Sequence, residues 1–125
     1  MILYKELTDE IINCFFSVYE ELGYGFLENV YEKALIPELE LNDIKSASQV
    51  SIDASYKNAI VGKYFADILV ENKVILELKA TPFKTEHTYQ ILNYLKATEI
   101  EVGYLLSFGK KPKFERFIFS NDFKR

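Results

Sequence analysis

Apolar side chains recur every three or four positions near the start of the chain, which is the spacing of one face of an α-helix. Between residues 8 and 22 this face consists of Ile11, Phe15, Val18, Tyr19 and Leu22. Thr8 is a candidate N-cap, and Gly23 is a candidate helix end. The pattern predicts a first helix over residues 8–22.

A second helix is predicted over about residues 27–41, with Val30, Ala34 and Leu35 turned inward. Pro37 lies inside this range. Because proline lacks a backbone donor and clashes with the preceding turn, we expect a kink or a helix boundary there.

The pattern then changes to alternation of apolar and polar residues, which is the period of a half-covered β-strand. In the first alternating segment, Val50, Ile52 and Ala54 share one side. Short polar segments at residues 57–58 and 71–73 interrupt the pattern and predict turns. Three strands are therefore expected, over residues 48–56, 60–70 and 74–80.

Helical spacing returns over residues 85–99, where Ile91 begins a new apolar face. Two further strands are predicted over residues 102–108 and 114–120, joined by a basic loop at residues 109–113. The predicted element order is ααβββαββ. We expect a fold of the α/β (α+β) class, in which helices flank a mixed central β-sheet.

The length and composition agree with this fold. A chain of 125 residues is long enough to bury one core, so we expect a single domain over residues 1–125. No run of apolar residues approaches the roughly 18 positions of a membrane span, and the N-terminus lacks the order of a signal peptide. We therefore expect a cytoplasmic protein with no membrane contact. Cys14 falls in the first helical pattern and is expected to be a buried small hydrophobe.

The net charge of −4 is spread unevenly along the chain. Residues 1–62 carry 4 Lys and Arg against 11 Asp and Glu, whereas residues 63–125 carry 11 against 8. Acidic proteins are poor candidates for coating nucleic acid electrostatically. A local basic surface in the second half of the chain would still hold phosphates.

Two carboxylates converge in the predicted central hairpin. Glu77 and Lys79 share one face of their strand with Ile75. If Val70 pairs with Val74, Asp67 lies directly across from Glu77, whereas a slip of one residue would turn Asp67 to the opposite face. The site therefore depends on the register of this hairpin.

The residues around these carboxylates predict a sheet covered on both sides. Phe65 and Leu69 share the face of Asp67, and Ile75 shares that of Glu77. Because an uncompensated buried carboxylate is costly, the charges need a partner. An ion pair with Lys79 would be a purely structural partner, and a bound metal ion would be a functional one.

Several motifs resemble one known group of proteins. Asp67 followed by Glu77-Leu78-Lys79 is similar to the D…(E/D)-x-K pattern of the PD-(D/E)XK nuclease superfamily. The segment "GFLENVY" at residues 25–31 resembles the G-x-x-E-x-x-Y motif of the GxxExxY family, which is placed in that superfamily. The chain is similar to this family from about residue 7 to residue 119. The resemblance implies a restriction-endonuclease-like core.

The resemblance also implies roles for individual residues. Asp67 and Glu77, the Leu78 carbonyl and Glu28 would bind Mg²⁺ or Mn²⁺, which prefer oxygen ligands. Lys79 would hold the attacking water or offset charge on the phosphate. Tyr31 would orient Glu28 through its hydroxyl, and Gly25 would permit a close backbone approach. Alternatively, Glu28 only complements the helix dipole and Tyr31 only packs in the core.

Other polar residues are expected near this site. His87, Gln90 and Tyr94 fall on one stripe of the third helix, and the last two match a Q-x-x-x-Y spacing found in several nuclease branches. We expect Gln90 and Tyr94 to position a phosphate or Lys79. A basic cluster near the C-terminus is a candidate nucleic-acid contact or simply a solvated loop, and it comprises Lys110, Lys111, Lys113 and Arg116.

The sequence therefore predicts a metal-dependent phosphodiesterase acting on nucleic acid, with DNA preferred over RNA. A homodimer would supply a larger footprint. The rival hypothesis is a catalytically inactive nuclease-fold module that binds a protein partner through its acidic half. A small-molecule binding protein has only the aromatic content in its favour, and aromatic residues are mostly core.

Overall fold

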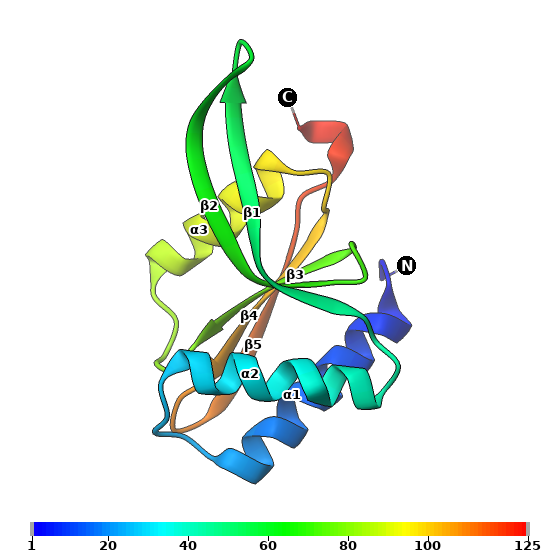
Figure 1. The fold of residues 1–125 in the computed structure, drawn as a ribbon, viewed down its shortest axis with the longest axis vertical. Coiled ribbons are helices and arrows are strands. Elements are labelled where there is room, and N and C mark those ends of the chain that lie inside the picture. Colours follow the sequence, from blue (N-terminus) through cyan, green and yellow to red (C-terminus); the bar gives the residue numbers. More distant parts are fainter. Residues whose placement is uncertain (1, 125) are drawn as a thin grey trace.

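The computed structural model describes residues 2–124, which form three α-helices and a five-stranded mixed sheet (Figure 1). The strand order in the sheet is β1-β2-β3-β4-β5. The predicted element order ααβββαββ is confirmed, followed by a short 3-10 helix. The elements are α1 (Lys5–Leu22), α2 (Glu28–Leu41), β1 (Ser46–Tyr56), β2 (Ala59–Val70), β3 (Val74–Lys79), α3 (Thr85–Ala97), β4 (Val102–Phe108), β5 (Pro112–Ile118) and η1 (Asn121–Phe123).

Helix α1 begins earlier than predicted. Its N-cap is Tyr4, and Thr8 lies buried inside the helix, where its hydroxyl donates to the Lys5 carbonyl at 3.2 Å. The N-cap role predicted for Thr8 is therefore wrong, because the helix already has a turn before it. Gly23 ends the helix as expected, with φ 67° and ψ −163°. That backbone region is essentially restricted to glycine.

Helix α2 runs through Pro37 without a boundary. The expected boundary is wrong because Pro37 lies on the exposed side of the helix, where water can bind the carbonyl that the missing N–H leaves free. The buried face of α2 consists of Tyr31, Leu35 and Leu39. Val30 and Ala34, which were expected to point inward, are only half-buried.

The sheet is covered on both faces. Helices α1 and α2 pack on one face over a first core cluster that includes Phe15, Leu35 and Leu76. Helix α3 packs on the other face over a second, smaller cluster that includes Ile75 and Leu95. Strand β3 is buried along both faces, as the apolar residue beside Glu77 predicted. It pairs antiparallel with β2 and parallel with β4, so α3 makes the crossover between the two parallel strands.

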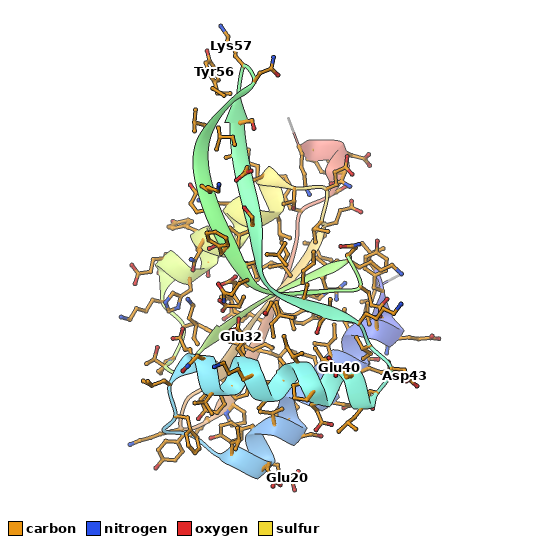
Figure 2. The ribbon with its side chains drawn as sticks, viewed as in Figure 1. Glu20, Glu32, Glu40, Asp43, Tyr56 and Lys57 are labelled. Carbon is orange, nitrogen blue, oxygen red and sulfur yellow. The ribbon has the colours of Figure 1, made fainter. Side chains whose placement is uncertain are left out.

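Strands β1 and β2 form a long hairpin that projects from the body of the molecule beyond α3 (Figure 1). Its turn is at Lys57 and Asn58, where the sequence predicted a turn, and both residues have positive φ. Tyr56 and Lys57 lie at the tip, whereas acidic side chains such as Glu40 lie on the helical side of the molecule (Figure 2). Phe65 lies on this arm and is 51% exposed. The expectation that it shares a covered surface with Asp67 is wrong, because the arm extends beyond the helices.

The last elements differ slightly from the predicted ranges. Helix α3 ends at Ala97, where Thr98 donates its hydroxyl to the Tyr94 carbonyl at 2.9 Å. Strand β5 begins at Pro112, so part of the predicted basic loop belongs to the sheet. Cys14 is buried, as expected. Within residues 2–124, every helix is too short or too polar to cross a lipid bilayer.

Candidate active site

The hairpin register brings Asp67 and Glu77 together. Val70 pairs with Val74, which is the register under which Asp67 was expected to face Glu77, and the same register runs through the next two pairs toward the site. The Asp67 N–H donates to Glu77 Oε1 at 3.0 Å, and the Leu78 N–H donates to Asp67 Oδ2 at 2.8 Å. Each carboxylate is therefore held by the backbone of the strand that carries the other.

Glu77 lies in an environment that opposes its ionisation. Its side chain is only 2% exposed. Burial, followed by the negative charge of Asp67, raises the pKa of Glu77 to about 8, although the Asp67 N–H and Lys79 act in the opposite direction. Two carboxylates held this close resist carrying two negative charges without a cation between them.

Lys79 does not provide an ion pair that would compensate this charge. It lies half-buried at the end of β3, beside Ser107 of β4. Among residues 2–124, the one salt bridge within 4.0 Å joins Lys5 and Asp9. Lys79 therefore forms none with Asp67 or Glu77. The structural partner considered for the two carboxylates is therefore not formed.

The donor set fits a divalent cation that retains water ligands. In the part of the chain that the structure describes, no three carboxylate, imidazole or thiol groups gather closely enough to form a complete protein cage. Asp67 and Glu77 form a pair, and each keeps one carboxylate oxygen outside the backbone bonds described above. Mg²⁺ is commonly held by one or two carboxylates, water and substrate phosphate, so this pair suits it. Leu78 gives its N–H to Asp67, and its carbonyl stays a predicted ligand.

Glu28 reaches the same edge of the sheet from α2. It is the first residue of the helix, and its Oε2 accepts from the Ala80 N–H at 3.4 Å, just past Lys79. Glu28 and Asp67 also line one cavity of about 200 Å³. The position at the helix N-terminus also suits the dipole, so both roles considered for this carboxylate are compatible with the structure.

The cavity contains a third acidic residue that the motif analysis did not select. Glu32 lies one helical turn after Glu28, and its Oε1 accepts from Gln49 Nε2 at 2.8 Å. Burial raises the pKa of Glu32, while the hydrogen bond from Gln49 lowers it. The spacing of four residues from Glu28 was a signal in the sequence that could have identified Glu32.

Tyr31 does not contact Glu28 through its hydroxyl. The hydroxyl donates to the Gly23 carbonyl at 2.7 Å and accepts from the Phe26 N–H at 3.2 Å. Its ring is fully buried and stacks on Phe108 with centroids 4.2 Å apart. The predicted orienting role is wrong, because both hydrogen bonds hold the connection between α1 and α2.

The glycine of the same motif is also explained by the backbone. A Cβ built at Gly25 would meet no atom within 4 Å, so the predicted close approach is wrong. Its φ of 111° is the reason that glycine suits this position.

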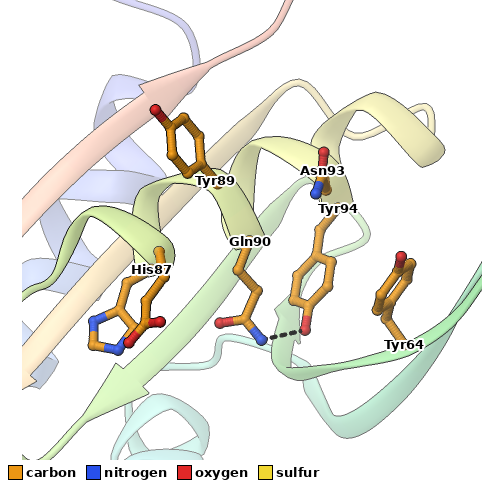
Figure 3. A pocket seen from close by; sticks show the side chains of 7 residues that line it. Tyr64, His87, Tyr89, Gln90, Asn93 and Tyr94 are labelled. Atoms are coloured by element: carbon orange, nitrogen blue, oxygen red, sulfur yellow. Dashed lines mark hydrogen bonds between the residues drawn. The ribbon is translucent and has the colours of Figure 1, made fainter.

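Helix α3 contributes a tyrosine whose hydroxyl is bound by a glutamine of the same helix (Figure 3). Gln90 Nε2 donates to the Tyr94 hydroxyl at 2.8 Å. Burial, followed by the negative charge of Glu77, raises the pKa of Tyr94 to about 12. The ring of Tyr94 is buried in the second core cluster rather than lying on a solvated stripe, since the hairpin arm covers it.

His87 lies at the start of α3. Its Nδ1 accepts from the Lys84 N–H at 3.1 Å, which caps the helix. Partial burial, followed by the charge of Lys79, lowers the pKa of His87. This residue is therefore a helix-capping group near the site, and it favours the neutral imidazole.

The predicted basic cluster divides into two parts. Lys110, Lys111 and Lys113 are exposed around a cavity of about 240 Å³ that also includes Ser107, the neighbour of Lys79. Arg116 instead donates to the Tyr104 hydroxyl and to the Leu3 carbonyl, both at 2.8 Å. The predicted phosphate contact of Arg116 is wrong, because its guanidinium is engaged in anchoring the N-terminal segment.

Comparison with known proteins agrees with this geometry. A family model described as the PD-(D/E)XK nuclease superfamily matches residues 5–117. No curated protein and no solved structure matches the chain. The match spans both helices before the sheet, the carboxylate hairpin and most of β5. The chain therefore belongs to the PD-(D/E)XK nuclease superfamily.

Proposed function

We propose that this protein is a metal-dependent nuclease that hydrolyses phosphodiester bonds of DNA, with RNA as the second candidate substrate. The observation that carries the proposal is the Asp67–Glu77 pair, which is held by backbone hydrogen bonds and lacks a compensating cation from the protein. Membership of the nuclease superfamily supports the same reaction class. A catalytically inactive module would have no evident reason to keep this costly pair.

The residues of the chain would divide the work as follows. Asp67 and Glu77 hold Mg²⁺ or Mn²⁺, with Glu28 contributing from the helix side. The bound ion supplies Lewis acidity toward the phosphate and lowers the pKa of a water molecule. Lys79 presents its ammonium group at the end of β3, where it offsets charge that develops on the phosphoryl oxygens. The exposed lysines of the β4–β5 turn and of the start of β5, which are Lys110, Lys111 and Lys113, would hold the nucleic-acid backbone next to the site.

The narrower assignments belong to the same proposal. Gly25, Glu28 and Tyr31 match the motif of the GxxExxY family, and we place the chain in that family. The five strands form one sheet, which supports a single domain over residues 1–125. A homodimer and a protein partner stay predictions.

A cleavage assay tests the proposal. Purified protein is incubated with linear, circular, branched and single-stranded DNA and with RNA, in Mn²⁺ or in chelator. We expect cleavage that requires the metal and falls at least about 100-fold in Lys79→Ala, the usual scale for losing a group that stabilises developing charge. Asp67→Asn should have a similar effect.

The matched control is Lys45→Ala, which removes an exposed lysine just before β1 and should leave cleavage unchanged. Equal cleavage by wild type and Lys79→Ala would overturn the assignment of the site. Absence of cleavage on every substrate, in protein that binds Mn²⁺ through Asp67, would favour the inactive module.

A further inference from the structure

A groove lined by tyrosines lies between the hairpin arm and α3 (Figure 3). One cavity of about 440 Å³ is lined in part by Tyr64 of β2 and by Tyr89, Gln90 and Tyr94 of α3. A second cavity, of about 490 Å³, shares Tyr64 and Asn93 with the first. The two cavities therefore adjoin at Tyr64 and Asn93, and together we call them the tyrosine groove.

The tyrosine groove follows one side of α3. Its helical lining runs from Glu86 in the first cavity to Ala97 in the second. At 1.5 Å per residue this is about 16 Å. Stacked nucleotides rise about 3.4 Å each along one strand, so the groove accommodates roughly five of them.

One end of the groove lies near the strand that carries Glu77. Tyr94, which lines the first cavity, packs in the second core cluster with Ile75 of β3. Ile75 lies two residues before Glu77 on the same face of that strand. Gln90, in the same cavity, donates to the Tyr94 hydroxyl. Nucleic acid bound in the groove would therefore lie close to β3 and its carboxylate.

The charges of the lining do not suit a groove that binds nucleic acid mainly through its phosphates. The lining contains one lysine, Lys96, and two acidic residues, Glu86 and Asp53. Duplex binding depends on several Lys or Arg side chains per turn of the backbone. What this lining offers instead is the accessible aromatic rings of Tyr64 and Tyr89, which are 39% and 65% exposed, and the side-chain amides of Gln90 and Asn93.

We propose that the tyrosine groove is a base-binding subsite for an unpaired strand, which makes single-stranded nucleic acid, or the single-stranded end of a duplex, the substrate. This inference rests on the proposed nuclease function and specifies its substrate. Unpaired bases stack on aromatic side chains whatever their sequence, and amide groups bind the base edges that a duplex would occupy. The arm of β1 and β2 is the wall that holds the bases against α3.

Equilibrium binding with a fluorescent base tests the proposal. Oligonucleotides with 2-aminopurine in an unpaired region, or in a fully paired one, are titrated with Lys79→Ala protein in Mg²⁺, so that bound strands stay uncut. DNA and RNA forms are compared. We expect tighter binding and stronger quenching for the unpaired probe.

Variants of the lining should weaken this binding. Tyr64→Ala and Tyr89→Ala should each reduce affinity for the unpaired probe about tenfold, which is within the usual effect of removing one stacking ring. Tyr64→Phe should retain binding, because it keeps the ring. Tyr89 is 65% exposed, so its substitution tests the groove without disturbing the core.

The matched control is Tyr24→Ala, which removes a 58% exposed tyrosine from the connection between α1 and α2. It should leave binding unchanged. Equal affinity for paired and unpaired probes, or full binding by both alanine variants of the groove, would overturn the inference. Either result is compatible with Mn²⁺-dependent cleavage that the Lys79→Ala substitution abolishes. The nuclease proposal would therefore still stand. Displacement of the bound probe by an added competitor protein, but not by an unlabelled oligonucleotide, would also contradict the assignment of the groove to nucleic acid.

Discussion

Glu77 shows how one residue can be both a structural cost and a functional group. It lies on a strand that is buried from Val74 to Leu78, where an apolar residue would suit the packing. Its hydrogen bond from the Asp67 N–H orients the carboxylate but does not remove the repulsion between the two acids. A residue of this kind is typical of sites whose charge is balanced by something that binds.

The raised pKa of Glu77 predicts a specific pH dependence of stability. The folded protein keeps the proton up to about pH 8, whereas the unfolded chain loses it near 4.5. Between these values the folded state binds more protons, so the free energy of unfolding should fall as pH rises. The loss is about 1.4 kcal/mol for each unit of pKa difference that Glu77 retains in solution.

Urea unfolding of metal-free protein between pH 5 and pH 9 measures this effect. Glu77→Gln should flatten the decline and should be the more stable protein at the alkaline end. Glu115→Gln, which changes an exposed residue of β5, should keep the wild-type slope. A parallel decline in Glu77→Gln would show that other groups are responsible.

At the scale of elements, the connection between α1 and α2 sets the position of Glu28. The Tyr31 hydroxyl binds the Gly23 carbonyl and the Phe26 N–H, so the start of α2 is tied to the end of α1. The Tyr31 ring also packs on Phe108 at the end of β4. This connection therefore anchors the helix end that carries Glu28 near the edge of the sheet.

Gly23→Ala is expected to destabilise this connection by about 1–3 kcal/mol. A Cβ at this position would meet no atom within 4 Å, so the cost is one of backbone conformation alone. Thermal or urea unfolding measures the loss, with Ser17→Ala on the exposed side of α1 as the control. Asn should not rescue stability, because ψ at this residue is −163°, outside the left-handed helical region that Asn tolerates. A Gly23→Ala variant as stable as the wild type would contradict the backbone conformation described for Gly23.

At the scale of the whole molecule, the site joins elements that are far apart in the sequence. Asp67 and Glu77 come from the central hairpin, Glu28 comes from α2, and Tyr94 comes from α3 on the other face of the sheet. Ligand binding at such a junction stabilises every element that meets there. Metal binding should therefore raise the stability of the entire fold.

We expect Mn²⁺ to raise the melting temperature, and to do so more at pH 8.5 than at pH 6. At the lower pH the ion must first displace the proton of Glu77. An ion at 100 times its Kd stabilises the folded state by about 2.7 kcal/mol. Differential scanning calorimetry measures the shift, and chelator should reverse it. Asp67→Asn should abolish most of the shift, whereas Glu115→Gln should retain it; an undiminished shift in Asp67→Asn would place the metal elsewhere.

Local patterns in the sequence were sufficient for the order of the elements. Apolar residues beside Asp67 and Glu77 predicted a sheet covered on both faces, and pairing of Val70 with Val74 across the polar turn was the register under which Asp67 would face Glu77. These features depend on neighbours a few residues apart, so periodicity and turn chemistry determine them. The superfamily followed from the same residues and agrees with the family match.

Tertiary contacts decided which polar residues were free to act. Tyr31 and Arg116 looked like site residues, but their polar atoms are bound elsewhere. The Tyr31 hydroxyl binds the Gly23 carbonyl across the connection between α1 and α2, and Arg116 binds the Leu3 carbonyl, which is distant in the sequence. Glu32 and Tyr64 gained their positions only from the packing of α2 and the hairpin arm. By itself, the sequence determined the order of the strands and identified the hairpin register that would bring the two carboxylates together, because these depend on short-range geometry. Only the folded structure decided which side chains were occupied and where a groove remained, because both depend on segments that meet through packing.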